Sequence, residues 1–263
     1  MQYFDSIYIL VLLMKTIQIL STTISETSVE EVSEILTTSK SQKVAICNTN
    51  TVVRSYNDSA LSEIINSFDI KTPDGFPIAK SSSILYKNNQ KRVDGYNVFL
   101  STIREGLKKN TSHYFFGSTN NVLEKLIKRL EEDFPEIKIA GSFSPPVGDY
   151  KELTQQKYII EMQKAKPDIV WVSLGFPKQE KFIKHLQMKH PVHSNLVGVG
   201  AVFEWVAGTK IKAPEFIANI GLEWILRLLQ EPKRLFRRYF VDNFLFLYLI
   251  TKQFISNRQT DNI

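Results

Sequence analysis

Short apolar runs alternate with amphipathic stretches over most of the chain. Such runs predict buried strands at residues 43–47, 113–117, 137–141, 168–174 and 195–203. Between them, apolar residues recur at helical spacing, as Val122, Leu126 and Leu130 do. This spacing predicts helices at residues 53–67, 97–109, 121–133, 152–165 and 179–189. Near-continuous apolar strands separated by helices are typical of a parallel sheet covered on both faces, so we expect an α/β fold with a Rossmann-like core.

The pattern changes after about residue 215, where the chain becomes helical, aromatic and strongly apolar. Basic residues gather in the same stretch: Arg227, Lys233, Arg234, Arg237 and Arg238. This composition suits a helix lying at a membrane surface, and it suits equally a terminal helix packed on the core with its bases in solvent. No apolar run reaches the roughly 18 uninterrupted residues of a membrane span. We expect a core at 14–218 and a basic, aromatic, membrane-associating appendage at 219–263.

The chain starts with a short apolar segment, IYILVLLM, at residues 7–14. A bilayer span needs about 20 apolar residues. A signal peptide needs basic residues ahead of its apolar segment, whereas here an acid, Asp5, stands there. We expect residues 1–13 to be a non-native or flexible extension ahead of a natural start at Met14. A short segment that touches the membrane is the alternative.

Charge and cysteine content narrow the class of partner. The net charge of +6 and the pI of about 9.2 favour anionic partners: nucleic acid, phosphate-bearing substrates or anionic lipid. The single cysteine, Cys47, excludes a disulfide within the chain and fits a reducing compartment. No Cys/His cluster has zinc spacing, and the core lacks a motif that reads RNA or DNA.

Several predicted strands end in glycine or a small polar residue, in FFGS, IAGS, SLGFPKQ and GVGA. Ligands of open α/β sheets bind at the carboxyl ends of the strands, where helix N-termini favour phosphate. Four such ends in one chain make a nucleotide-type ligand plausible, although glycines also end strands simply to turn. Neither G-x-G-x-x-G after the first strand nor G-x-x-x-x-G-K-[ST] is present, which disfavours the dinucleotide-binding and P-loop classes.

Candidate catalytic chemistry begins with Asp74 in TPDGFP, residues 72–77. From the pattern alone, Pro-Asp-Gly is more often a turn. The functional alternative is a carboxylate that accepts a proton from a substrate hydroxyl as general base. Eighteen residues later, Arg92 of RVDG is either a surface charge or a ligand for a departing diphosphate. Because the chain has no D-x-D pair for a metal, arginine and lysine would have to stabilise that diphosphate.

Amide side chains follow the first predicted strand of the core. Asn48 and Asn50 stand in CNTNTVV, where they could read a sugar or a base edge. An Asx turn or a helix cap is nearly as good an interpretation.

A series of motifs occurs in a fixed order along the chain: NTNTVV, PDGFP, RVDG, FFGS, PPVG, PDIVWVSLGFPKQE, VGVGAVFEWVAG, KAPEF and GLEWILRLLQEPKRLFRRY. This series resembles the WecG/TagA/CpsF family of bacterial glycosyltransferases over about residues 17–240. The resemblance implies an inverting, metal-independent transferase with no cofactor. Such an enzyme moves a sugar, often N-acetylmannosamine, from UDP to an undecaprenyl-diphosphate-linked sugar. The product would enter teichoic acid or another cell-surface polysaccharide. The implied location is the inner face of the bacterial cell membrane, with a homo-oligomer as a further option.

The resemblance also assigns residues by position. Asp74 matches the family's proposed base, with Arg92 and Gln179 as further catalytic positions. The implied substrate-binding positions are Asn48, Gly117, Pro146, Gly175, Gly200, Arg227, Arg234 and Arg237. Two positions depart from the family pattern: Ile46 replaces a threonine, and Lys212 replaces an arginine. The first change removes a hydroxyl contact, so the identity of the donor or acceptor sugar stays open.

Other classes remain beside this reading. The same family includes enzymes that use a UDP-glucose-type donor. A nucleotide-sugar-binding protein without catalysis would keep the pocket and lack a working base. A nucleic-acid-binding protein would use the basic appendage, although its aromatic residues fit lipid equally well and we expect no nucleic-acid partner.

Overall fold

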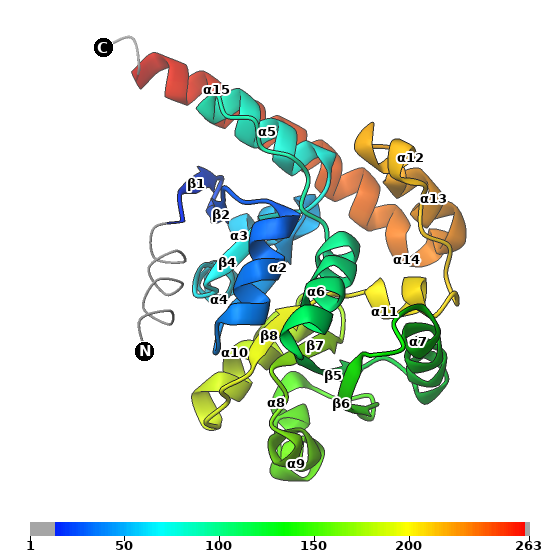
Figure 1. Cartoon of the computed structure of the whole chain (residues 1–263). Helices are drawn as coiled ribbons and strands as arrows, with labels where there is room; N and C mark the ends of the chain where they lie inside the picture. Colours follow the sequence, from blue (N-terminus) through cyan, green and yellow to red (C-terminus); the bar gives the residue numbers. More distant parts are fainter. Residues whose placement is uncertain (1–13, 261–263) are drawn as a thin grey trace.

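A six-stranded parallel sheet forms the centre of the protein (Figure 1). The computed structural model describes residues 14–260, apart from the side chains of residues 234, 237–239 and 260. The strand order is β4–β3–β8–β7–β5–β6. The strands are β3 (Lys43–Cys47), β4 (Ile70–Pro73), β5 (Ser112–Gly117), β6 (Lys138–Phe143), β7 (Ile169–Ser173) and β8 (Asn195–Gly198). The predicted α/β class is confirmed, and the expectation for residues 1–13 lies outside the described residues.

Five of the six strands lie where the apolar runs predict them. The prediction for 195–203 is too long, because the chain turns at Gly200, with φ of +58°, and enters helix α11 (Val202–Val206). Strand β4 is not predicted, because Lys71 interrupts a run of only four residues. The Lys71 side chain is buried, and its ammonium group donates to the backbone oxygen of Phe68 at 2.6 Å.

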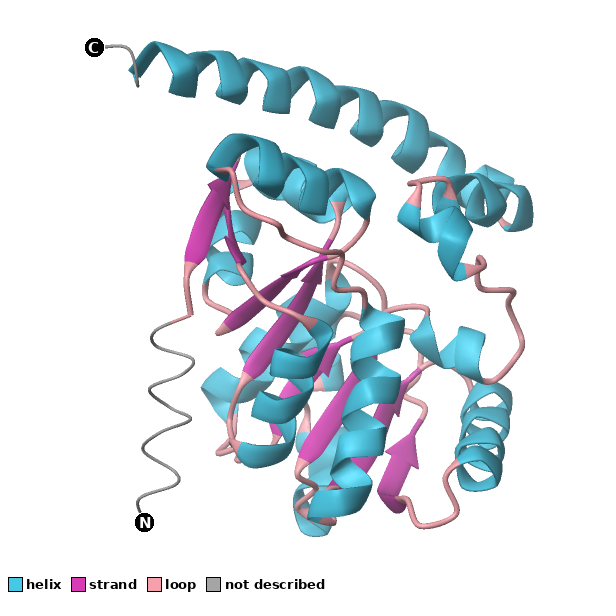
Figure 2. Ribbon diagram, turned by 45° about the horizontal axis from the view of Figure 1, so that its top comes forward, coloured by secondary structure: helices cyan, strands magenta, loops and turns pink. Residues whose placement is uncertain are grey.

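Helices cover both faces of the sheet, as Figure 2 shows. Alternate residues of each strand point to opposite faces, so Ile169 and Trp171 belong to one apolar core while Val170 and Val172 belong to the other. The first core contains α2 (Val29–Thr38), α6 (Gly95–Lys109), α7 (Asn120–Asp133) and α11. The second contains α3 (Thr49–Asn57), α4 (Ser59–Asn66), α9 (Gln156–Ala165) and α10 (Lys178–Lys189).

Two predicted helices are each divided in the structure. The segment 53–67 falls into α3 and α4, because Asp58 ends the first helix and caps the second by accepting from the backbone N–H of Leu61. The segment 152–165 falls into α8 (Tyr150–Leu153) and α9. Helices α2 and α5 (Phe76–Tyr86), and the antiparallel hairpin of β1 (Thr16–Ile19) and β2 (Thr22–Ser25), are not predicted.

The appendage is helical and folds back over the core (Figures 1 and 2). Its helices are α12 (Glu215–Asn219) at the boundary, then α13 (Glu223–Gln230), α14 (Pro232–Arg237), the π-helical turn Arg238–Asp242 and α15 (Asn243–Thr260). Side-chain hydrogen bonds fix it: Gln230 pairs with the backbone of Ile211, and Gln253 pairs with the backbone of the β1–β2 hairpin. Within residues 14–260, no helix has the length and apolar character of a membrane span.

Candidate active site

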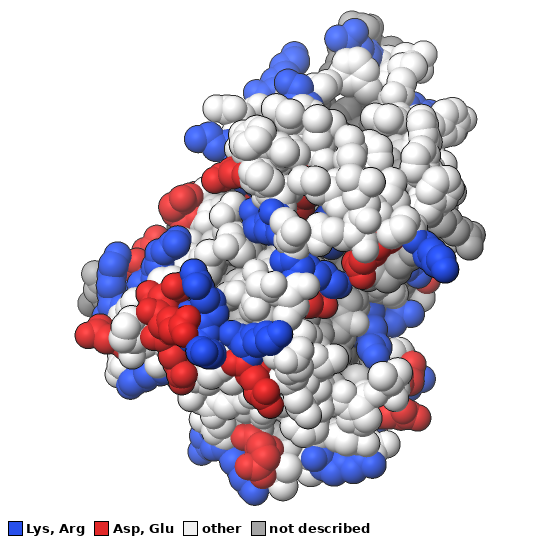
Figure 3. All heavy atoms as spheres, turned by 90° about the vertical axis from the view of Figure 1, so that its right-hand side faces the viewer, with Lys and Arg blue, Asp and Glu red and all other residues white. Residues whose placement is uncertain are grey.

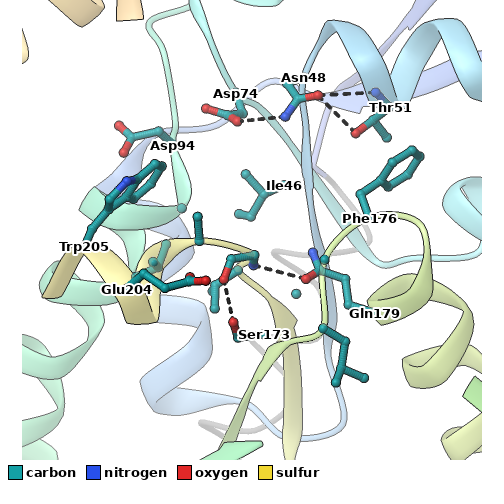
Figure 4. Close-up of a pocket in the computed structure, with 18 of the residues that line it drawn as sticks. Ile46, Asn48, Thr51, Asp74, Asp94, Ser173, Phe176, Gln179, Glu204 and Trp205 are labelled. Atoms are coloured by element: carbon teal, nitrogen blue, oxygen red, sulfur yellow. Dashed lines mark hydrogen bonds between the residues drawn. The ribbon is translucent and has the colours of Figure 1, made fainter. Parts of the chain in front are cut away.

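A polar cavity of about 290 Å³ opens at the carboxyl ends of the parallel strands (Figure 4). Its walls come from the turns that follow β3, β4, β7 and β8, from the start of α6, and from α13 of the appendage. In the close-up, Asn48 and Asp74 lie on one side, with Ser173 and Gln179 across the cavity from them. This is the edge of the sheet at which the glycine-ended strands predict a ligand site.

Asp74 lies directly after β4 and faces the cavity. Its backbone N–H donates to the backbone oxygen of Cys47 at 2.9 Å, which ties the turn after β4 to the end of β3. The Nδ2 of Asn48 donates to the Asp74 carboxylate at 3.4 Å. The Asn48 oxygen accepts from the backbone N–H of Thr51 and so caps α3. Asn48 therefore combines the two roles left open by its sequence position: it caps a helix and it lines the cavity.

The electrostatic surroundings of Asp74 favour its protonated form more than water does. Burial raises the pKa of Asp74 to about 6. The negative charges of Glu223 and Asp94 act in the same direction. The positive charges of Arg92 and Arg227 oppose this rise in pKa. A carboxyl with a pKa near 6 is mostly ionised at neutral pH and is still basic enough to accept a proton, as a general base requires.

Arg92 lies behind the cavity wall. Its guanidinium group is 3.3 Å from the carboxylate of Asp94 and 3.3 Å from that of Glu223, and its side chain is 8% exposed. Asp94 also caps α6 by accepting from the backbone N–H of Asn97. Arg92 is not among the residues that line the cavity. The structure therefore places it where it holds an acid of the core and an acid of the appendage together beside Asp74.

The cations on the cavity wall are Arg227 and Lys210. The Arg227 guanidinium lies 5.0 Å from the centre of the Trp205 ring, in cation–π contact. Lys210 reaches Glu204 at 3.5 Å and Glu231 of the appendage at 3.2 Å. The predicted sites Arg234 and Arg237 lie on α14, but their side chains are outside the described part of the structure.

Gln179 is buried at the start of α10 and joins two loops. Its Oε1 accepts from the backbone N–H of Gly200 at 3.0 Å, and its Nε2 donates to Glu180 at 2.9 Å. A Cβ at Gly198 would come within 2.9 Å of the Gln179 amide, so the glycine makes room for it. Gln179 lines the cavity while its amide holds the turns after β7 and β8 in place. Beside it, Lys178 donates to the backbone oxygen of Gly148 at 2.9 Å.

The remaining predicted positions differ in where they lie. Gly175 and Gly200 line the cavity, with φ values of +75° and +58° that favour glycine. Gly117 does not line it. Its φ is +118° and a Cβ there would overlap with the backbone of Ser173, so it brings β5 close to β7. Pro146 is exposed on the loop after β6 and is not part of this wall.

Lining residues that were not singled out from the sequence include five with charged or aromatic side chains: Asp94, Glu204, Trp205, Lys210 and Glu223. Four of them stand inside the motifs RVDG, VGVGAVFEWVAG and GLEWILRLLQ, so the signal was present without a role attached to it. Lys210 lies outside those motifs. Glu204 has one carboxylate oxygen near Lys210, while its other oxygen is buried with no hydrogen-bond partner among the described residues. That oxygen can accept a hydrogen bond from a hydroxyl group of a ligand.

Among residues 14–260, no group of three or more His, Cys, Asp or Glu side chains is arranged to hold a metal ion. The N-termini of α3, α6 and α10 open on the cavity and supply partial positive charge. This arrangement can bind a phosphate-bearing ligand beside a carboxylate that is able to accept a proton.

Comparison with known proteins agrees with the ordered motifs. The chain is 33% identical over 171 residues to an N-acetylglucosaminyldiphosphoundecaprenol N-acetyl-beta-D-mannosaminyltransferase of Bacillus spizizenii, covering 65% of this chain and 64% of that protein. It is 30% identical over 172 residues to the protein of the same name in Bacillus subtilis, covering 65% of each. The match therefore spans just under two thirds of these two relatives. The Staphylococcus aureus protein of that name is 28% identical over 194 residues, covering 73% of each.

A family model extends the match over nearly the whole described chain. The model of the glycosyl transferase WecG/TagA/CpsF family matches residues 15–260, which include the core, both sides of the cavity and the appendage. With the cavity at the carboxyl ends of the strands and the motifs that surround it, this match shows that the chain belongs to the glycosyl transferase WecG/TagA/CpsF family.

Proposed function

We propose that this chain transfers N-acetylmannosamine, or a closely related sugar, from UDP to a sugar carried on undecaprenyl diphosphate. The family match supports a glycosyltransferase. The names of the Bacillus and Staphylococcus relatives support the transferred sugar and the lipid-linked acceptor. The product would be a lipid-linked disaccharide for a cell-surface polymer of the teichoic acid type.

The observation that carries the proposal is the position and pKa of Asp74. Its carboxylate faces the cavity at the carboxyl end of β4, and its pKa is raised to about 6. Across the cavity the turns after β7 and β8 supply glycines and backbone N–H groups, as a nucleotide-sugar site requires. An aspartate that only forms a turn would be more stable in solvent, because burial and the nearby acids Glu223 and Asp94 disfavour its ionised form.

The proposed reaction is a single displacement with inversion at the sugar carbon. Asp74 takes the proton of the acceptor hydroxyl as the oxygen forms its bond to the anomeric carbon of the donor. The bond between that carbon and the phosphate oxygen breaks, and its electron pair leaves with UDP. Protonated Asp74 then releases its proton to solvent.

Charge on the departing UDP needs stabilisation, and we assign this to protein groups in place of a metal. Arg227 and Lys210 line the cavity, and the N-termini of α3, α6 and α10 open on it. Arg234 and Arg237, on the helix that follows α13, are proposed as further contributors. The absence of a D-x-D pair from the sequence supports a metal-independent reaction.

The appendage is proposed to hold the enzyme at the inner face of the cell membrane, where the lipid acceptor lies. Large apolar side chains are exposed along it, including Phe216, Leu229, Phe236, Phe244 and Leu247. Figure 3 shows the side on which α12–α14 lie, and the right-hand side of its upper half is mostly free of charged side chains. Exposed lysines at Lys233 and Lys252 add attraction to anionic lipid.

The test is a transfer assay with the purified full chain. The substrates are a panel of UDP-sugars and a short-chain polyprenyl-diphosphate N-acetylglucosamine, and the product is identified by mass spectrometry. We expect a disaccharide lipid with UDP-N-acetylmannosamine, and we expect it to form in the presence of EDTA. A disaccharide formed only from a UDP-glucose-type donor would change the donor assignment. Failure of every donor would remove the proposed activity.

A further inference from the structure

A second, smaller cavity lies on the appendage side of Asp74. We propose that it binds the terminal sugar ring of the lipid-linked acceptor, with the ring resting against Phe76. This inference rests on the proposed function. The cavity has a volume of about 90 Å³ and lies between the turn that starts α5 and the appendage helices. Nothing in the family match or in the names of the relatives assigns it a ligand.

The two cavities meet at the proposed base. Four residues line both of them: Asn48, Asp74, Glu223 and Arg227. A single displacement requires the base to touch the acceptor hydroxyl while that hydroxyl points at the donor sugar carbon. A carboxylate shared by two cavities meets this requirement if one cavity holds the donor and the other holds the acceptor.

Size and wall chemistry decide which substrate belongs where. The larger cavity has a volume of about 290 Å³, whereas the smaller one has about 90 Å³. Of these two cavities, only the larger one reaches the glycine turns after β7 and β8. A UDP-sugar needs the larger volume and the backbone N–H groups of those turns. The smaller cavity is left for a ligand without a nucleotide, such as a single sugar ring.

The wall of the smaller cavity has an aromatic side and a polar side. Phe76 is 42% exposed, and it lines this cavity together with Trp224. An aromatic ring offers a flat apolar face to the C–H groups of a sugar. Gly221, with φ of +83°, lets the appendage approach that ring, because a Cβ there would come within 3.1 Å of it. On the polar side, the Asn243 amide is oriented by the Thr49 hydroxyl, which donates to it at 2.8 Å.

An aromatic path connects this cavity with the exposed apolar surface of the appendage. Trp224 meets the ring of Phe240 edge-on, with centroids 6.2 Å apart. Phe240 in turn stacks on Phe236 at 4.5 Å. Phe240 is 39% exposed and Phe236 is 58% exposed. A lipid chain attached to a sugar in the smaller cavity can therefore lie along these rings toward the membrane, whereas a nucleotide gains nothing from such a path.

The test separates acceptor binding from donor binding. The variants Phe76→Ala and Phe76→Tyr are compared with the wild type, using UDP-N-acetylmannosamine and a water-soluble, short-chain acceptor in the absence of membranes. Ile84→Ala is the matched control, because Ile84 lies on the same helix, is 49% exposed and lines neither cavity. KM is measured for each substrate, and UDP affinity is measured by calorimetry, which also reports an intact fold.

We expect Phe76→Ala to raise the acceptor KM by about five- to twelvefold, the effect of losing a stacking contact of about 1–1.5 kcal/mol. Phe76→Tyr keeps the ring and should stay within about twofold of the wild type. Donor KM and UDP affinity should not change in any of these proteins. An unchanged acceptor KM in Phe76→Ala, or a raised donor KM instead, would overturn the assignment while leaving the transferase activity in place. A wild type that makes no product would instead remove the proposed function, and the assignment with it.

Discussion

Glu223 of the appendage and Arg92 of the core form an ion pair at 3.3 Å directly beside Asp74. The pair lies at the junction of the two parts of the chain, since Glu223 begins α13 and Arg92 follows α5. Arg92 holds Asp94 at the same time, at 3.3 Å. The electrostatic surroundings of the proposed base are therefore complete only when the appendage lies on the core.

Replacing Glu223 by glutamine should shift the pH dependence of transfer. The negative charge of Glu223 raises the pKa of Asp74, and its loss also leaves the positive charge of Arg92 with one fewer acidic partner. Both effects lower the pKa of Asp74, so the acidic limb of the rate–pH profile, expected near pH 6 in the wild type, should move to lower pH. Glu215→Gln, an exposed acid of α12, is the control. An acidic limb that stays in place or moves to higher pH would contradict the account.

Asp74→Asn should make the fold more stable at neutral and alkaline pH. The pKa of Asp74 is raised in the folded protein, so its ionisation costs stability as pH rises from about 4 through about 6. Because the side chain is partly exposed, we expect a gain of about 1–2 kcal/mol at pH 8, or a Tm increase of about 2–6 °C. Thermal melts at several pH values measure it. The gain should vanish below about pH 3, where the carboxyl is protonated in both the folded and the unfolded chain. Equal melting temperatures of wild type and variant at pH 8 would contradict a carboxyl whose ionised form is destabilised by burial.

Gln230→Ala should loosen the appendage without touching the base. The Gln230 amide makes two hydrogen bonds to the backbone of Ile211, at 3.1 and 2.9 Å. The loss of these bonds should weaken the docking of the appendage by about 1–2 kcal/mol, so amide hydrogen exchange over residues 210–231 should become faster. We also expect a lower kcat, because Glu223 and Arg227 reach the site from α13. The matched control is Gln163→Ala, a half-buried glutamine whose partner is the exposed side chain of Gln156. Faster exchange with full kcat would show that appendage docking is not needed for turnover.

Arg227→Lys should lower kcat/KM for the UDP-sugar by about 10- to 100-fold, because lysine loses the planar contact with Trp205 and the two-point geometry for phosphate. Steady-state kinetics with varied donor measures the effect. Arg258→Lys is the control, since Arg258 also lies over an aromatic ring, that of Phe254, on the same appendage. Equal losses in both variants would point to a general weakening of the appendage.

Periodicity predicts most of the core, and its failures have physical causes. Strand β4 is missed because Lys71 is polar in sequence, although its ammonium group finds a backbone oxygen in the interior. The segment 53–67 is read as one helix because Asp58 gives no break in the apolar pattern while it ends one helix and caps the next. Local patterns report which residues are apolar, whereas hydrogen bonds between a side chain and a backbone group three residues away decide these two cases.

The sequence predicts the residues of the site unevenly. Asp74, Asn48, Gly175, Gly200 and Gln179 follow strands, so the topology of a parallel sheet brings them together at one edge. Glu223 could not be placed from local sequence, because its position depends on the contact between the appendage and Arg92. The sequence also does not show that Arg92 is held behind the wall, or that Pro146 is exposed away from it.

The central claim is that Asp74 accepts the proton of the acceptor hydroxyl during sugar transfer. The most direct measurement is single-turnover formation of the lipid-linked disaccharide by wild type and Asp74→Asn, with UDP affinity measured on the same samples. The account predicts unchanged UDP affinity and a transfer rate lowered by about 100- to 10,000-fold in the variant. Transfer by Asp74→Asn at the wild-type rate would contradict it.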